Sequence, residues 1–176
     1  LRMEKENPKV YVPQQFSNPN NPLVHKYHTA LEILEQAEGP IDGFCSGVGT
    51  GGTLSGIGDV LKNQYPDILI WAVEPENAAI LSGGSIGTHL QMGIGDGLIP
   101  DNLNTDIYSD ICIITDEEAL ATAKKLAREE GLMCGISSGT NVAAAIKMAK
   151  KLGKGKRVVT ILPDTGERYF STELFE

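Results

Sequence analysis

The chain has 176 residues, a length that fits one domain with a full hydrophobic core. Its formal net charge of -8 argues against the basic surface that nucleic-acid binding requires. No apolar run in the sequence approaches the roughly 18 residues that a membrane-spanning helix needs.

Three cysteines, Cys45, Cys112 and Cys134, lie far apart and form no C-x-x-C pair. An odd number without close spacing predicts buried free thiols rather than a disulfide framework. This use of cysteine is typical of a reducing compartment, so we expect a cytoplasmic protein.

The first half of the chain alternates turn, helix and strand signals. The segment QQFSNPNNP, residues 14–22, is predicted to be an irregular turn because its Asn-Pro steps interrupt a helix. Apolar residues at helical spacing then predict a helix over 23–38. Three more elements are expected: a strand over 41–46, a helix that ends at Leu61 and a strand over 67–74. This strand–helix–strand order predicts a parallel sheet.

The second half begins with a long glycine-rich stretch, residues 75–106, that lacks regular structure of its own, as functional loops often do. A strand over 110–115 leads into a helix that ends at Glu130, with Thr115 and Glu118 as a capping box. The remaining expected elements are a glycine-serine turn, an alanine-rich helix over about 141–152, a strand over 157–163 and an extended C-terminal tail. The alternation predicts an α/β fold, an open doubly wound and mostly parallel sheet flanked by helices.

The stretch CSGVGTGGTLSG joins a predicted strand to a predicted helix. Backbone N–H groups and the helix dipole converge at such a turn, which predicts an anion site. The spacing of Gly47, Gly49 and Gly52 matches a dinucleotide fingerprint, and Glu74 lies where the ribose-binding acid is expected. The shorter word GTGGT, residues 49–53, fits a single phosphate instead. The local sequence leaves both anions open.

A second glycine-serine turn, GISSG at residues 135–139, is expected at the same sheet edge. Its serines either cap the following helix or face a ring nitrogen or carbonyl in the pocket. Other candidates have ordinary structural interpretations. His25 and His28 lack a third metal ligand nearby, so no metal site is predicted, and Cys134 is expected to be packed rather than reactive.

Five ordered motifs resemble the cysteine synthase (O-acetylserine sulfhydrylase) family, within the fold type II β-family of pyridoxal-phosphate enzymes. They are QQFSNPNNP, SGVGTGGTLSG, GIGDGLIP, EGLMCGISSG and GERYFSTELF, and together they run over essentially the whole chain. The broader family includes cystathionine β-synthase, threonine synthase and serine/threonine dehydratases, among which the GERYxST ending favours cysteine synthase. The resemblance disfavours an NAD-binding domain and leaves Glu74 without a ribose to bind.

The resemblance assigns site residues one by one. The loop that holds the phosphate of pyridoxal 5'-phosphate is matched by Gly49, Thr50, Gly51, Gly52 and Thr53. Ser137 matches the hydroxyl that faces the pyridine nitrogen. A neutral hydroxyl leaves the ring a weaker electron sink than an aspartate would, which suits elimination of a β-leaving group.

The loop GIGDG matches the substrate side of the family's pocket, with Gly93 and Asp96 as its candidate residues. Asp96 stands where the family pattern has alanine, and Met92 stands where it has glutamine. These departures leave the substrate preference open.

For the intact enzyme, the resemblance implies β-replacement of O-acetylserine with sulfide, giving L-cysteine and acetate. It also implies a homodimer that can bind the C-terminus of serine acetyltransferase. The family's Schiff-base lysine lies in an S-x-K-x-R-like segment upstream of QQFSNP, and no lysine here has that setting. We therefore expect residues 1–176 to be the C-terminal part of the large cofactor-binding domain, without a catalytic residue and inactive alone.

Two other functions stay open at this point. One is cystathionine β-synthase-like activity, with homocysteine as the nucleophile. The other is a non-catalytic module that binds pyridoxal phosphate or a partner chain.

Overall fold

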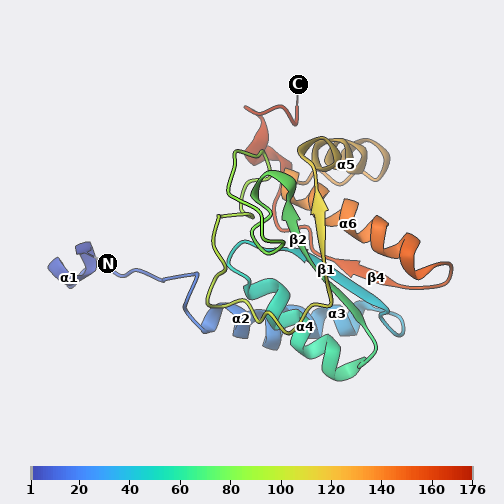
Figure 1. Ribbon diagram of the computed structural model, residues 1–176, viewed down its shortest axis with the longest axis horizontal. Helices are drawn as coiled ribbons and strands as arrows, with labels where there is room; N and C mark the ends of the chain where they lie inside the picture. The colour runs from blue at the N-terminus through green and yellow to red at the C-terminus, as the bar shows by residue number, and fades with distance from the viewer. Residues whose placement is uncertain (1, 176) are drawn as a thin grey trace.

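Four parallel strands form the centre of the fold in the computed structural model, which describes residues 2–175 (Figure 1). Across the sheet their order is β3-β2-β1-β4, and every neighbouring pair is parallel. The bounds are β1 Gly43–Gly47, β2 Leu69–Pro75, β3 Asp110–Ile114 and β4 Val158–Thr160. The winding runs from β1 through β2 to β3 and then returns to β4 on the other side of β1, which confirms the predicted open parallel α/β fold.

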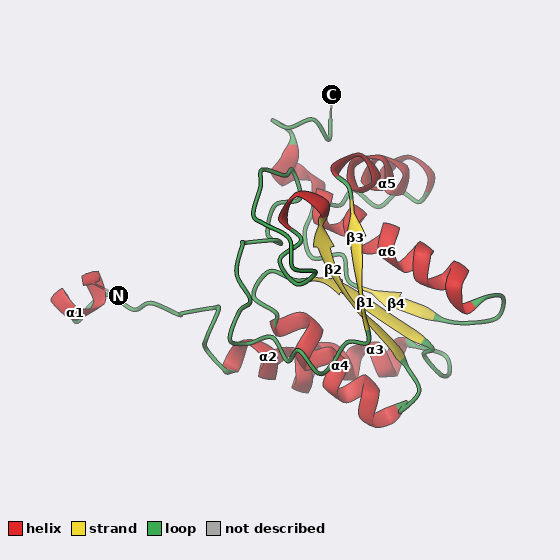
Figure 2. Ribbon diagram, in the orientation of Figure 1, coloured by secondary structure: helices red, strands yellow, loops and turns green. Residues whose placement is uncertain are grey.

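Helices cover both faces of the sheet (Figure 2). On one face lie α4, Gly52–Gln64, and the helical run that precedes β1, and on the other lie α5, Asp116–Glu129, and α6, Ile136–Leu152. Successive strand residues point to opposite faces, so each face has its own core. Phe44 packs with the α4 core, whereas its neighbour Cys45 packs with the α6 core.

The helical run before β1 is continuous but not uniform. It consists of α2, Asn20–Val24, the π-helical segment η1, His25–Thr29, and α3, Ala30–Gln36. The predicted helix is confirmed over most of its length, but it begins three residues earlier than 23, so the end of the expected turn over 14–22 is wrong. Proline is tolerated at the cap and in the first turn, where backbone N–H groups have no helical acceptor, and Pro19 and Pro22 occupy those positions.

The two helices of the other face differ in how well their starts were predicted. The capping box of α5 is confirmed: the Thr115 hydroxyl accepts from the Glu118 N–H at 3.1 Å, and the Glu118 carboxylate accepts from the Thr115 N–H at 3.2 Å. Helix α6 begins at Ile136 rather than near 141, with extended Gly135 as its N-cap, so GISSG is a first helical turn. Gly139 is a glycine because a side chain there would collide with the backbone of α5.

Irregular chain lies along the carboxyl edge of the sheet. After the short 3-10 turn η2, Glu76–Ala78, no regular element occurs in the described chain before β3, as predicted for 75–106. Strand β4 pairs over three residues only, so the expected strand over 157–163 is too long. The expected extended tail is wrong, because it folds into the 3-10 turn η3, Gly166–Tyr169, which the Gly166 N–H fastens to the Met133 carbonyl. Helix α1, Arg2–Glu6, lies apart from the rest (Figure 1).

All three cysteines are free and buried, which confirms the prediction from their spacing. Among residues 2–175, no helix combines the length and apolar character needed to cross a membrane.

Candidate functional site

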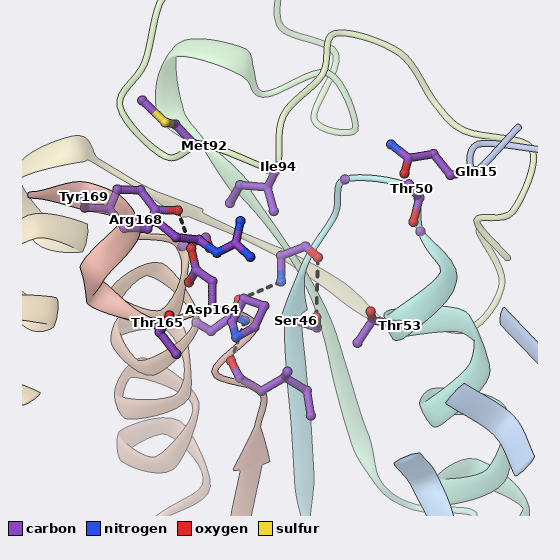
Figure 3. A pocket seen from close by; sticks show the side chains of 18 residues that line it. Gln15, Ser46, Thr50, Thr53, Met92, Ile94, Asp164, Thr165, Arg168 and Tyr169 are labelled. Atoms are coloured by element: carbon purple, nitrogen blue, oxygen red, sulfur yellow. Dashed lines mark hydrogen bonds between the residues drawn. The ribbon is translucent and has the colours of Figure 1, made fainter. Parts of the chain in front are cut away.

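A cavity of about 690 Å³ opens at the carboxyl ends of β1 and β4 (Figure 3). Its wall comes from segments far apart in the sequence, which lie within residues 46–53, 92–94, 137–141 and 161–169, together with Gln15. Ligands of open parallel sheets bind at this edge, where the loops that follow the strands converge. The cavity therefore lies at the edge of the sheet where the sequence predicts the site residues.

The glycine loop forms one side of this cavity. Gly51 has a φ of +79°, and a Cβ on it would lie 2.7 Å from the Leu103 Cβ, so this position requires glycine. Gly51 is also the N-cap of α4, which has no side-chain cap. The N–H groups of the first turn of α4 thus lack both an intrahelical acceptor and a capping side chain. Together with the dipole of a 13-residue helix, they give this end of the cavity the character that favours an anion.

The structure brings the predicted phosphate-binding residues together. Those that line the cavity are Gly49, Thr50, Gly51 and Thr53. Gly52 lies just behind the lining, as the first residue of α4. The threonine hydroxyls add donors to the free backbone N–H groups, and this arrangement has the composition of a cradle for one phosphate.

The two serines of GISSG have different environments in the first turn of α6. Ser137 is only 4% exposed and lines the cavity. The Ser138 hydroxyl is turned to a protein partner, and it donates to the Asp164 carboxylate at 3.1 Å. Neither serine is the N-cap, because Gly135 has that position. Ser137 is therefore the hydroxyl of this pair that lines the cavity.

Asn141 is a cavity residue that the sequence reasoning missed. Its Oδ1 accepts from the Gly47 N–H at 2.7 Å, and its Nδ2 donates to the Ile161 carbonyl at 2.7 Å. The amide thus bridges the chain that leaves β1 and the chain that leaves β4. A signal was available, since Asn141 is a polar residue one helical turn after Ser137 in an otherwise alanine-rich stretch.

The C-terminal segment supplies the remaining polar wall, which sequence reasoning also missed. Tyr169 donates its hydroxyl to the Asp164 carboxylate, and Arg168 extends from η3 into the cavity (Figure 3). Burial, together with the hydrogen bond to this carboxylate, raises the pKa of the Tyr169 phenol. The available signal was the polar word DTGERY directly after the last predicted strand, at the edge where ligands bind.

The residues of the loop GIGDG differ in whether they line the cavity. Gly93 lines the cavity, with Met92 and Ile94 beside it. Asp96 is not part of the lining, and its carboxylate lies next to Gly49. Of the two predicted substrate-side residues, Gly93 is therefore the one that faces the cavity.

Glu74 has a structural role that explains its place at the end of β2. Its carboxylate is 2% exposed and accepts from the backbone N–H groups of Leu81 and Ser82 at 2.8 and 3.0 Å. It holds the loop that follows β2, so no free carboxylate is left for the ribose of a dinucleotide. His89 likewise makes local contacts, with the Gly95 carbonyl and the Gln91 N–H. Burial raises the pKa of Cys134, in agreement with a packed thiol.

Comparison with known proteins identifies the class to which this fold and site belong. Residues 1–164 match the family described as "Pyridoxal-phosphate dependent enzyme", and the chain belongs to that family. Among its relatives, a cysteine synthase of Staphylococcus aureus is 54% identical over 172 residues, which are 97% of this chain and 56% of that protein.

Solved structures agree with this assignment. A cysteine synthase of Entamoeba histolytica is 40% identical and has a TM-score of 0.93 over 99% of this chain and 52% of its own. An O-acetylserine-dependent cystathionine β-synthase of Helicobacter pylori is 38% identical, with a TM-score of 0.92 over 99% of this chain and 57% of its own. The chain thus spans about half the length of the relatives that it matches.

The residues of the cavity fit the cofactor of this family. The uncapped start of α4 leaves backbone N–H donors for a phosphate, and the turn that precedes it depends on Gly51, where a side chain would collide with Leu103. Ser137 offers a neutral hydroxyl elsewhere on the same wall, and a hydroxyl can donate to an unprotonated pyridine nitrogen. The donor set therefore matches pyridoxal 5'-phosphate at both ends.

Proposed function

We propose that the intact protein to which this chain belongs is a cysteine synthase, which replaces the acetate of O-acetylserine with sulfide and releases L-cysteine. The observation that carries this proposal is the meeting of the GTGGT loop and Ser137 on one cavity, in a chain 54% identical to a cysteine synthase. Pyridoxal phosphate, when bound, supplies an electron sink for chemistry at the substrate's α- and β-carbons.

The chain's own residues have three tasks in this proposal. Residues 49–53 bind the phosphate and so fix the position of the cofactor ring. Ser137 holds the ring nitrogen through a neutral hydroxyl, which does not keep a proton on the ring. Gly93 lies in the part of the lining that we assign to the amino-acid substrate, where the absence of a side chain leaves room for it.

A product assay on the intact protein tests the reaction. With O-acetylserine and sulfide, we expect stoichiometric release of cysteine and acetate that depends on added pyridoxal phosphate. Release of neither product, with the cofactor bound, would reject the proposal and favour a non-catalytic module that binds the cofactor or a partner chain.

Cystathionine β-synthase-like activity is the second candidate, since the chain is 38% identical to a Helicobacter pylori enzyme named as an O-acetylserine-dependent cystathionine β-synthase. The discriminating assay replaces sulfide with homocysteine at equal concentration. A higher kcat/KM with sulfide supports the first candidate, and a higher value with homocysteine supports the second.

We further propose that residues 1–176 are the C-terminal part of the cofactor-binding domain and contain no catalytic residue. Support comes from the coverage of about half of each relative and from the lack of a lysine in an S-x-K-x-R setting. This polypeptide alone should then show no cysteine synthesis. Activity of the 176-residue chain by itself would contradict this assignment.

The resemblance also supports a cytoplasmic homodimer that binds the C-terminus of serine acetyltransferase. Light scattering of the intact protein, with and without a peptide of that C-terminus, measures both associations. A monomeric protein that does not bind the peptide would contradict this part of the proposal.

A further inference from the structure

Two side chains of the helical run 20–36 contact the threonine hydroxyls of the phosphate loop. Asn21 Nδ2 donates to Thr50 Oγ1 at 2.9 Å. His25 Nε2 lies 3.2 Å from Thr53 Oγ1, and His25 Nδ1 lies 3.1 Å from Thr29 Oγ1. Neither Asn21 nor His25 lines the cavity, so both act from behind the loop.

Close packing of α4 against this run makes the contacts possible. A Cβ on Gly52 would collide with the Asn21 side chain, and a Cβ on Gly56 would lie 2.9 Å from the Cβ of His25. Glycines at these positions let the two helices approach until short side chains reach across. The ion pair between Lys26 and Asp59 joins the same two elements.

The orientation of the Asn21 amide is fixed by a second contact. Nδ2 also donates to the Gln15 carbonyl at 2.7 Å, and a carbonyl accepts hydrogen bonds only. The atom that faces Thr50 is therefore an N–H donor, and Thr50 Oγ1 is the acceptor. Because this contact uses an oxygen lone pair, the hydroxyl hydrogen of Thr50 remains free to donate into the cavity.

His25 controls Thr53 in the same way through its tautomer. With the hydrogen on Nε2, His25 donates to Thr53 and accepts from the Thr29 hydroxyl, so the Thr53 hydrogen stays free for an anion. With the hydrogen on Nδ1, Thr53 donates to His25 and presents only lone pairs to the cavity. A bound anion thus favours the first tautomer.

We propose that Asn21 and His25 are positioning residues that turn the Thr50 and Thr53 hydroxyl hydrogens toward the phosphate, with the hydrogen of His25 on Nε2. The inference rests on the proposed phosphate cradle and names the side chains that orient it. Sequence motifs alone place Asn21 in a turn and His25 on an ordinary helix, so the pairing follows from the structure.

The test compares pyridoxal 5'-phosphate with pyridoxal, which lacks the phosphate, as ligands of the intact apoprotein. The ratio of the two affinities isolates the phosphate contacts. Asn21→Asp removes the donor, and Asn20→Asp makes the same charge change at the exposed neighbouring residue. His25→Leu is paired in the same way with His28→Leu, at an exposed histidine.

We expect the wild-type preference for the phosphate to fall about tenfold in Asn21→Asp, because the new carboxylate accepts the Thr50 hydrogen that would otherwise reach the phosphate. In His25→Leu we expect a fall in the same direction but smaller, because the Thr53 hydroxyl loses only the donor that orients it. Asn20→Asp and His28→Leu should keep the wild-type ratio. A wild-type ratio near one would overturn the phosphate cradle itself. A wild-type preference that survives in Asn21→Asp and His25→Leu would overturn only the positioning role, as would an equal fall in the two controls.

A second measurement remains valid if either variant folds poorly. Nitrogen-15 NMR of wild-type His25 reports its tautomer while inorganic phosphate is added to the apoprotein. A shift toward the tautomer with hydrogen on Nε2 supports the inference, and a phosphate complex with hydrogen on Nδ1 contradicts it.

Discussion

Asn141 links two ends of parallel strands through one amide group. Its hydrogen bonds to the Gly47 N–H and the Ile161 carbonyl satisfy backbone groups that have left the sheet ladder, and its side chain is almost fully buried. A buried backbone group that loses its hydrogen-bond partner destabilises the fold, because its desolvation is no longer offset. This amide therefore contributes both to stability and to the shape of the cavity.

Asn141→Leu keeps the volume but leaves both backbone groups unpaired. We expect a loss of about 2–6 kcal/mol in the free energy of unfolding, from two unsatisfied groups at about 1–3 kcal/mol each. Urea denaturation of the intact protein measures it. A change below about 0.5 kcal/mol would mean that water replaces the amide without cost.

Cys45 predicts how stability depends on pH. Burial raises the pKa of its thiol to about 12, whereas the unfolded thiol titrates near its ordinary value of 9.0. A group whose pKa is raised in the folded state stabilises the folded protein as long as the pH is below the pKa of the unfolded state. The contribution of Cys45 to stability is therefore complete below about pH 9 and is lost as the pH rises toward about 12. The raised pKa of Tyr169 acts in the same direction at alkaline pH.

The melting temperature should therefore fall steadily above about pH 9, and it should fall less steeply in Cys45→Ala. In that variant the melting temperature should still fall somewhat with pH, because Tyr169 also has a raised pKa. Identical slopes for wild type and Cys45→Ala would show that the thiol does not contribute.

Among the helices and strands, periodic and capped segments could be predicted well from the sequence, whereas the first turns of helices were predicted poorly. The capping box of Thr115 is local, so it could be found from a motif of four residues. The starts of α2 and α6 were missed because proline, glycine and serine in a first turn resemble a loop. Asp164 was missed because its contact with Ser138 of α6 depends on tertiary packing, and Tyr169 was missed although it lies in the polar segment that follows the last predicted strand.

The capping box gives a direct test of an element. Thr115→Ala removes the acceptor of the Glu118 N–H and should cost about 1 kcal/mol of stability, whereas Thr115→Ser should cost a few tenths. Chemical denaturation of the two variants compares them under the same conditions. Equal costs for Ala and Ser would contradict the capping role.

Gly51 offers a second test, because its left-handed backbone and its close approach to Leu103 both shape the phosphate loop. Gly51→Ala should cost about 1–3 kcal/mol of stability and should weaken pyridoxal-phosphate binding. Gly153 is the matched control: its φ is +89°, and a Cβ there would meet no heavy atom within 4 Å. Gly153→Ala should also cost about 1–3 kcal/mol, because φ +89° with ψ −177° is a backbone conformation that side chains disfavour, but it should leave cofactor affinity unchanged. Equal affinities of the two variants for pyridoxal phosphate would show that Gly51 does not contribute to cofactor binding.

The sheet has a core on each face and presents its carboxyl edge to the cavity that contains the predicted site residues. The α4 side contributes the phosphate loop, and the α6 side contributes Ser137 and Asn141. Family membership agrees with this geometry, since the chain matches pyridoxal-phosphate enzymes over residues 1–164. The sequence could predict the general position of the site because loops after parallel strands meet at one edge.

A crystal structure of the intact protein with pyridoxal 5'-phosphate would show which residues hold the cofactor. We predict that the phosphate lies within hydrogen-bond distance of backbone N–H groups in 49–53, with the pyridine nitrogen facing the Ser137 hydroxyl. A phosphate bound outside the GTGGT loop, or a ring nitrogen paired with a carboxylate instead of Ser137, would contradict it.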